Sequence, residues 1–428
     1  MIALSDGGLL QKIKIFGGII LNTKLKRNIS ISYVYNFFLQ LNITSAIWVL
    51  YLAFKGMSLI EIGILESIYH ITGLLLEMPS GALADLRGRK FCVVLGRAVN
   101  LISCILMITS NSFWGFAISF IFSSAAMNLN SGAAEALIFD SLKELGEEEN
   151  YKKIWGQLAF VMSIAQGIAV MLGGILADIS FLYAYIFGTV IQIVALIISF
   201  NFKEAPIHDK KSDNDREQDK QKKLIIGQVA TSIKVLKERK TIFYTILFSA
   251  LVGSLQTTVF FYSQQYFSDM GFTKTGIAFI CALGSLIEAF SSKFAYRFEG
   301  RMKLKGTLIT ISSLNIIALV GLAFFKELSV LFYILTTVTG GLAFTIFSDY
   351  INSGIPSEYR ATILSFDSLC FSLFMICLFP LVGFMAEYFG FSITFAGTAI
   401  IYIPVMVFLM KKLTKHNMEK LRSEGILA

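Results

Sequence analysis

Charged residues are scarce in this sequence, and their scarcity limits the class of protein it can encode. Asp, Glu, Lys and Arg make up 15% of the 428 residues, whereas hydrophobic residues make up 55%. Soluble globular domains carry roughly a quarter of their residues as charges. The composition therefore excludes an ordinary water-soluble domain and indicates a chain whose solvent is lipid.

Histidine and cysteine are also few, which argues against an enzyme or a metalloprotein. The three histidines are His70, His208 and His416, and the sequence has neither an HExxH motif nor a P-loop nor a Ser/His/Asp arrangement. The five cysteines lie in apolar stretches without a CxxC pair, so we interpret them as small core residues. We expect no enzymatic activity, no cofactor and no metal site.

Long hydrophobic runs are abundant instead. A bilayer core ~30 Å thick is crossed by about 20 apolar residues in a helix. Twelve segments satisfy this requirement, and they predict an all-α membrane protein with twelve transmembrane helices. The expected spans are 30–54, 59–84, 91–110, 112–139, 155–178, 180–201, 241–267, 273–297, 305–325, 328–352, 362–387 and 390–411.

Charged segments separate the expected domains. Residues 202–240 predict a solvated linker between an N-terminal six-helix bundle, 30–201, and a C-terminal six-helix bundle, 241–411. The last part of the linker has apolar residues at helical spacing, which predicts an amphipathic helix on the membrane surface. We expect 1–29 as a cytoplasmic N-terminal segment and 412–428 as a cytoplasmic tail.

The distribution of positive charge predicts the orientation. With the N-terminus in the cytoplasm, 34 of the 37 Lys and Arg residues fall on the cytoplasmic side, and only Lys55, Lys274 and Lys326 fall outside. This predicts a multi-pass protein of the cell (inner) membrane with both termini cytoplasmic. The net charge of +8 is then a topology signal and a contact with anionic lipid, and we expect no nucleic-acid partner.

Two short patterns recur in the two halves. GALADLRGRK follows the second span and KFAYRFEGRMKLKG follows the eighth, while GGILADIS ends the fifth span and GFMAEYFG ends the eleventh. The last two share a glycine, two further residues, an alanine and an acid. Related halves predict a duplicated unit in which two bundles rock about a central site.

The turn after the second span resembles the signature of the major facilitator superfamily through Gly81, Asp85, Gly88, Arg89 and Lys90. The resemblance implies two pseudo-symmetric six-helix bundles and alternating-access transport by a monomer. It also implies a latch that stabilises one end state, in which Gly81 lets helices approach, Gly88 permits a tight turn, and the charged residues pair with the opposite half. The alternative is that the basic residues only hold the topology.

Further segments are similar to a bacterial subgroup of this superfamily. LLLEMPSGALAD resembles the macrolide and multidrug exporters. The fifth span carries AQGIAVMLGG, which keeps Gly173 and Gly174 of the drug–proton antiporter motif, but Val170 replaces its proline. Small residues there favour close packing, and the missing proline weakens the antiporter interpretation.

Ionisable residues inside spans are costly and usually functional. Glu66 and His70 are four residues apart in the second span, so they share a helix face, and Glu288 lies well inside the eighth span. A carboxyl group withdrawn from water can exchange a proton near neutral pH. These three residues are the proton-coupling candidates. The alternative is that a neighbouring helix or water satisfies each acid.

The remaining polar and aromatic residues suggest the chemistry of a substrate. We find no Lys or Arg at the middle of any expected span, which disfavours an anionic substrate. Aromatic and amide residues fit an apolar or cationic substrate, although many of them could face lipid instead. The substrate-cavity candidates are Tyr33, Phe37, Gln40, Gln256, Phe260 and Phe371.

The sequence thus favours a secondary transporter whose partners are a small-molecule substrate, protons and the lipid bilayer. Three hypotheses remain open: export of a drug-like compound by proton antiport, proton-coupled symport of a neutral nutrient, and a membrane sensor that does not transport. Protection of cells against a toxic compound would favour the first, and accumulation of a labelled sugar the second. The latch motif and the paired halves argue against the third.

Overall fold

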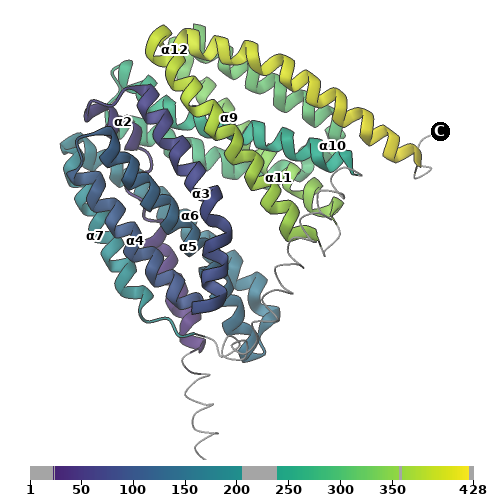
Figure 1. Ribbon diagram of the computed structural model, residues 1–428. Helices are drawn as coiled ribbons and strands as arrows, with labels where there is room; N and C mark the ends of the chain where they lie inside the picture. Colours follow the sequence, from purple (N-terminus) through teal and green to yellow (C-terminus); the bar gives the residue numbers. More distant parts are fainter. Residues whose placement is uncertain (1–22, 24, 205–238, 356–358, 424–428) are drawn as a thin grey trace, which may run out of the picture. The chain divides into compact units, whose positions relative to one another are not determined.

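The computed structural model of the chain describes residues 23, 25–204, 239–355 and 359–423. The chain divides into two compact units, whose elements are labelled in Figure 1. Most of the expected linker, with its amphipathic helix, and nearly all of the N-terminal segment lie outside the described residues. The division between the units runs through two helices, and it differs from the division at the linker that the sequence suggests.

Unit 1 is built from the N-terminal part of the chain. It contains a helical stretch at 25–40. It also contains α4 (Arg89–Thr109), α5 (Phe113–Leu145), the 3-10 helix η1 (Glu148–Asn150), the end of α3 (Leu59–Arg87) from Leu75, the larger part of α6 (Tyr151–Ile179), and nearly all of α7 (Phe181–Ser199).

Unit 2 combines the C-terminal helices with three short N-terminal pieces. These pieces are α2 (Trp48–Phe54), the start of α3 up to Leu74, and the end of α6 from Val170. The C-terminal helices are α9 (Lys240–Asp269), α10 (Lys274–Phe324), the 3-10 helix η3 (Lys326–Leu328), α11 (Ser329–Gly354) and α12 (Arg360–Ser423).

The fold class is the all-α membrane fold that the sequence predicts. Eight helices of the described part are long and apolar enough to cross a membrane. Two of them, α10 and α12, each contain two expected spans, which meet at backbone breaks at Lys303 (φ 54°) and Gly390 (φ 74°). Together with α5 and the broken first span, the described helices account for all twelve expected spans.

Some boundaries differ from the expected ones. The first helical stretch already includes residue 25, before the expected start at 30, and α12 continues to Ser423, well into the expected tail. The first span is also broken at 41–47, where Thr44 Oγ1 donates to Asn42 Oδ1 at 3.2 Å. Asn and Thr side chains compete with the helical backbone for hydrogen bonds, so the helix is interrupted where the chain passes from unit 1 to unit 2.

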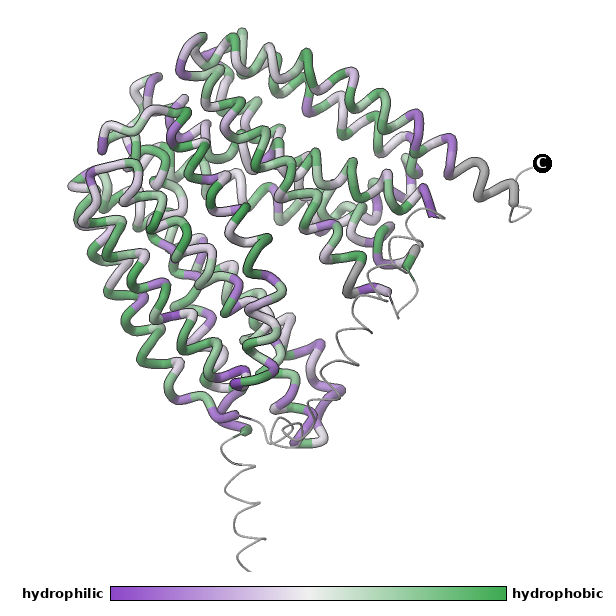
Figure 2. Tube along the Cα trace, in the orientation of Figure 1, coloured by the Kyte–Doolittle hydropathy of each residue, from purple (hydrophilic) through white to green (hydrophobic). Residues whose placement is uncertain are grey.

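Apolar residues form the core of each unit and also cover much of the helix surfaces. Tyr35, Leu137 and Phe202 belong to a buried cluster of unit 1, and Ile246 and Ile363 belong to one in unit 2. Figure 2 shows hydrophobic residues along the helices of both units and hydrophilic residues gathered toward turns and helix ends. Apolar side chains that are exposed on both units suit a lipid solvent rather than water.

Close packing between α10 and α11 depends on Gly341. A Cβ atom built on Gly341 would lie 2.2 Å from the backbone oxygen of Glu288 and 2.1 Å from Ser291 Oγ. Ser292 Oγ donates a hydrogen bond of 3.0 Å to the Gly341 carbonyl oxygen. Small residues let membrane helices approach closely enough for such contacts.

We expect Gly341→Ala to destabilise the protein, although alanine favours helices more than glycine does. Overpacking at such a contact costs about 1–3 kcal/mol, so the thermal unfolding midpoint in detergent should fall by several degrees. Gly167→Ala in α6 is the matched control, because nothing lies within 4 Å of a Cβ built there. Equal midpoints for the two variants would contradict the close contact.

Candidate functional site

A carboxylate and an imidazole lie together on one face of α3. Glu66 Oε1 and His70 Nε2 are 3.5 Å apart, and each side chain is 11% exposed. The spacing of four residues places both on the same side of the helix, as the sequence predicts. Their neighbours on the helix include the fully buried Ile62 and Leu65. The pair therefore occupies an apolar setting.

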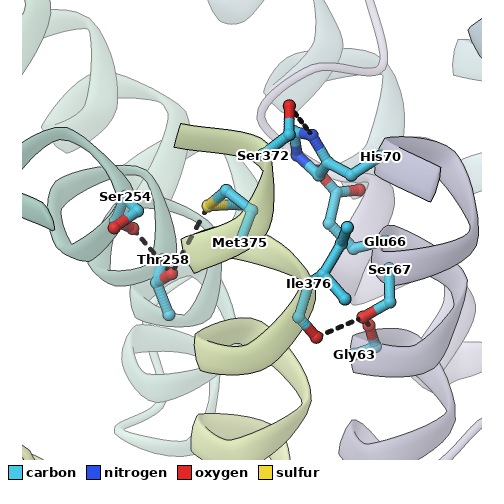
Figure 3. A network of polar contacts seen from close by, with 9 residues as sticks. All are labelled: Gly63, Glu66, Ser67, His70, Ser254, Thr258, Ser372, Met375 and Ile376. Atoms are coloured by element: carbon cyan, nitrogen blue, oxygen red, sulfur yellow. Dashed lines mark hydrogen bonds and ion pairs between the residues drawn. The ribbon is translucent and has the colours of Figure 1, made fainter. Parts of the chain in front are cut away.

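Residues of α12 complete the surroundings of the pair, as Figure 3 shows. His70 Nδ1 is 3.3 Å from Ser372 Oγ, and the His70 ring meets Phe371 edge-on at a centroid distance of 5.8 Å. One turn earlier, Ser67 Oγ donates to the carbonyl oxygen of Ile376 at 2.9 Å. These contacts all lie within unit 2. They connect the first part of α3 to α12.

The far side of α12 contacts α9. Thr258 Oγ1 donates to the Ser254 carbonyl oxygen at 2.7 Å and lies 3.8 Å from Met375 Sδ (Figure 3). The segment of α12 that carries Ser372 and Met375 is therefore held between α3 and α9. A shift of this segment would change its contact with the Glu66–His70 pair on one side and its contact with α9 on the other.

This arrangement suits the handling of a proton. A carboxylate accepts hydrogen bonds, and an imidazole both donates and accepts them. A protonated imidazole attracts the carboxylate more strongly than a neutral one does. Ser372 can serve either as donor or as acceptor to His70 Nδ1. The pair therefore places a carboxylate and an imidazole side by side at the junction of α3 and α12.

The third predicted proton-coupling residue, Glu288, lies elsewhere in unit 2. It is half-buried in α10, next to the α10–α11 contact at Gly341. Within the described residues, its carboxylate has no hydrogen bond or ion pair, and no contact joins it to Glu66 or His70. The structure thus brings two of the three candidates together and leaves the third apart.

The predicted cavity residues are divided between the units. Tyr33, Phe37 and Gln40 belong to unit 1, where Tyr33 Oη donates to Gln157 Oε1 at 2.6 Å and Phe37 meets Phe38 edge-on. All three are partly buried. Since Tyr33 is already paired with α6, its hydroxyl serves a contact between helices in this conformation.

The other three cavity candidates lie in unit 2. Phe371 touches His70 and packs against Gly253, which makes it part of the surroundings of the pair. Phe260 meets Phe261 edge-on at 5.0 Å. The Gln256 amide donates to the Thr336 carbonyl oxygen and fills the space beside Gly340, so it joins α9 to α11.

The predicted latch residues surround the turn between α3 and α4 in unit 1. Gly88 adopts φ +93°, a conformation that glycine tolerates and other residues rarely adopt. Asp85 Oδ1 accepts from Arg89 Nη2 at 2.9 Å, and Arg89 Nε lies 4.0 Å from Asp140 Oδ2 of α5. The charges that the sequence singled out therefore interact within their own unit.

Glu204 is part of this cluster, and sequence reasoning missed it. Its carboxylate accepts hydrogen bonds from the backbone amides of Arg89 (2.8 Å) and Lys90 (2.7 Å), the first two residues of α4. A Cβ on Gly88 would lie 2.9 Å from that carboxylate, so only glycine leaves room for it. Glu204 lies just beyond the last expected span of the N-terminal half, at the start of the charged linker. Nothing in the sequence distinguishes it from the other acids of the linker.

The two other latch residues make fewer contacts. No atom of its own unit lies within 4 Å of a Cβ built on Gly81, so the structure shows no close helix approach there within unit 1. Lys90 contributes its backbone amide to Glu204. The described interactions of the turn depend on Asp85, Gly88 and Arg89.

A buried arginine contradicts the expectation that no basic residue lies at the middle of a span. Arg97 is the ninth of the 21 residues of α4 and is 4% exposed. Its Nη1 donates to Gln192 Oε1 of α7 at 3.2 Å, and Asn100 Nδ2 donates to the same oxygen at 2.9 Å. The charge count had placed Arg97 with the loop residues. The argument against an anionic substrate therefore loses its basis, because a cation does lie inside this helix.

Known proteins resemble this chain over most of its length. YxaM, an uncharacterised MFS-type transporter of Bacillus subtilis, is 23% identical over 394 residues, which cover 90% of this chain and 96% of YxaM. A class H tetracycline resistance protein of Pasteurella multocida is 22% identical over 306 residues, or 69% of this chain and 72% of its own length. The crystal structure of the nucleoside transporter NupG superposes with a TM-score of 0.72 at 13% identity, over 92% of this chain and 98% of that one. At that identity the likeness shows the fold alone.

The family assignment agrees with the helices and the turn motif described above. The sequence profile of the Major Facilitator Superfamily matches residues 29–376. That range includes the Glu66–His70 pair, the α3–α4 turn and most of the described helices. The chain is therefore a member of the Major Facilitator Superfamily of membrane transporters.

Proposed function

We propose that this protein exports an apolar or cationic small molecule in exchange for protons, by alternating access. Membership of the family supports secondary transport of a small molecule across a membrane. The observation that carries the proton part of the proposal is the Glu66–His70 pair, which is buried and connects α3 to α12. The charge distribution supports a location in the inner membrane with both termini in the cytoplasm.

The position of the pair supports coupling between protonation and movement. Glu66 lies seven residues after Leu59, the first residue of α3, which is about 10 Å along a helix. An ionisable group at that depth, held among apolar side chains, has few alternatives to its partner. Because His70 contacts Ser372, a change of charge on the pair alters a contact between a helix of the N-terminal half and one of the C-terminal half.

The direction of transport is supported by one relative. The Pasteurella multocida protein is named for tetracycline resistance, and it matches about two thirds of each chain. The similarity of several segments to macrolide and multidrug exporters agrees with it. We therefore propose export rather than uptake.

The charged cluster at the α3–α4 turn supports a second element of the proposal. Arg89 lies between Asp85 and Asp140, and Glu204 holds the first amides of α4. A carboxylate at a helix N-terminus is stabilised by the positive end of the helix dipole. We propose that this cluster fixes the geometry of the turn and so favours one end state of the transport cycle.

We expect Glu66→Gln to abolish proton-driven export, because glutamine occupies the same space but cannot take up or release the proton. Cells that produce the protein should accumulate less ethidium than cells without it, and an uncoupler of the proton gradient should remove the difference. Glu66→Gln cells should accumulate ethidium like cells without the protein, although ethidium binding to the purified variant persists.

Glu288→Gln is the matched control, because Glu288 is also a half-buried carboxyl group of unit 2 but has no hydrogen-bond or ion-pair partner among the described residues. Full export by Glu66→Gln, with loss in Glu288→Gln, would transfer the proton role to Glu288. Uptake of ethidium into cells that produce the parent protein would contradict the proposed direction.

We expect Asp85→Asn to slow turnover by a factor of about 3–10, because a neutral side chain weakens the ion pair with Arg89. The rate of ethidium export from proteoliposomes measures the effect at equal protein content. Glu144→Gln, an exposed acid near the end of α5, should leave the rate unchanged. Equal rates for Asp85→Asn and the parent would argue against the latch.

A further inference from the structure

The acids within GGILADIS and GFMAEYFG make equivalent contacts in the structure. Asp178 near the end of α6 accepts hydrogen bonds from the backbone amides of Lys274 (2.8 Å) and Thr275 (2.8 Å), at the start of α10. Glu387 of α12 accepts from the amide of Leu59 (2.8 Å), the first residue of α3. Asp178 lies at the end of its helix, and Glu387 lies just before the break of α12 at Gly390. In both cases the acid caps the beginning of a helix from the other half of the sequence.

The glycines of the two motifs make equivalent contacts. Gly174 lies four residues before Asp178, and a Cβ built on it would be 2.7 Å from the Lys274 carbonyl oxygen. Gly383 lies four residues before Glu387, and its Cβ would be 2.3 Å from the Leu59 carbonyl oxygen. The glycine thus contacts the carbonyl of the same residue whose amide the acid caps. This close approach brings each acid within hydrogen-bond distance.

We propose that these two sites are symmetry-related clamps that hold the outer ends of the helices together and must open once in every transport cycle. The α6 clamp consists of Gly174 and Asp178 against Lys274 and Thr275. The α12 clamp consists of Gly383 and Glu387 against Leu59. The proposal rests on alternating access as proposed above, and it assigns positioning roles to Asp178 and Glu387.

The location of the clamps supports this role. Both lie within unit 2, where the ends of N-terminal helices pack with C-terminal helices. The charge count assigns this end of the helices to the outside, since Lys55 and Lys274 adjoin it. A pocket between the two halves can reach the outside only if the halves separate here, so both clamps must then break.

The chemistry of the clamps suits a contact that closes and reopens. The first amides of a helix have no partner within that helix, and a carboxylate satisfies them with charge-assisted bonds that the helix dipole favours. Asp178 and Glu387 are both exposed, so water can replace the backbone amides as hydrogen-bond donors when a clamp opens. In the α6 clamp, Lys274 Nζ also lies 3.9 Å from Asp178 Oδ1, a contact that Leu59 cannot provide.

Cysteine labelling from outside the cell tests the clamps. The five native cysteines are first replaced. Ser67→Cys then reports on access to the contact between α3 and α12, where Ser67 is 7% exposed. A membrane-impermeant maleimide should label this cysteine slowly in the parent. Asp178→Asn or Glu387→Gln should raise the rate on the order of threefold, and the double variant on the order of tenfold.

Substitution by alanine separates the cap from its charge. Asn and Gln retain one acceptor oxygen, whereas alanine has none. Asp178→Ala should therefore raise the labelling rate more than Asp178→Asn does. The conservative change Asp178→Glu should restore slow labelling. Asp269→Asn is the matched control, because this acid ends α9 but accepts from Gln265 of its own helix. If Asp178 were merely structural, its variants would lower the yield of folded protein, and the labelling rate would not rise from Asp178→Glu through Asp178→Asn to Asp178→Ala.

A second reporter distinguishes the clamps from the topology on which they depend. Asn111→Cys lies in the exposed turn between α4 and α5, which the charge count places outside. It should be labelled rapidly in every variant. Rapid labelling at Asn111→Cys with unchanged slow labelling of Ser67→Cys in the double variant would overturn the clamps and leave proposed export intact. Absence of export with the expected labelling order would overturn the proposed substrate and direction but not the clamps.

Discussion

The structure depends on how a chain in lipid satisfies the backbone amides at the beginning of its helices. The first amides of a helix have no acceptor within that helix, so each needs one from elsewhere in the chain or from water. Three long helices of this protein solve the problem with a carboxylate from a distant part of the chain. Glu204 caps α4, Asp178 caps α10 and Glu387 caps α3. Each contact satisfies the first amides of a helix and also fixes the position of that helix against a distant part of the chain.

The same constraint explains the Glu66–His70 pair. An acid among apolar residues requires a partner, and His70 supplies one from the same helix face. The contact of His70 with Ser372 then makes the pair sensitive to the position of α12. Glu387, on the same helix as Ser372, caps the beginning of α3. Among the described residues, three polar contacts therefore join α3 to α12: one at the helix end, one at Ser67, and one at His70, about 16 Å from the first.

Much of the fold follows from the sequence because its signals are strong over long segments. Twelve apolar runs predicted the helices, and the family signature at Gly88 and Arg89 predicted the turn between α3 and α4. The pair of Glu66 and His70 was predictable because residues four apart share a helix face. The repeated glycine–alanine–acid pattern was visible, but its partners Lys274 and Leu59 were not, since they are about 100 and over 300 residues distant.

Contacts between distant residues are where sequence reasoning failed. Arg97 was counted with the loop charges, although the buried oxygen of Gln192 from α7 accepts its hydrogen bond inside the helix bundle. Glu204 resembled any linker acid until its contact with α4 was seen. Helix boundaries also shifted, because Asn42 and Thr44 interrupt a run that is apolar on average. The cases of Arg97 and Glu204 depend on a distant partner that periodicity does not identify, whereas the break at Asn42 and Thr44 is local.

Proton release on ethidium binding measures whether Glu66 couples the movements of the proton and the exported compound. We propose that these two exclude one another in a single cycle in which Glu66 holds the proton. When ethidium is added to the purified protein in a weakly buffered detergent solution, a pH indicator should report about one proton released per ethidium bound at saturation. This release should disappear in Glu66→Gln while ethidium binding persists. Binding without proton release by the parent protein would contradict this coupling.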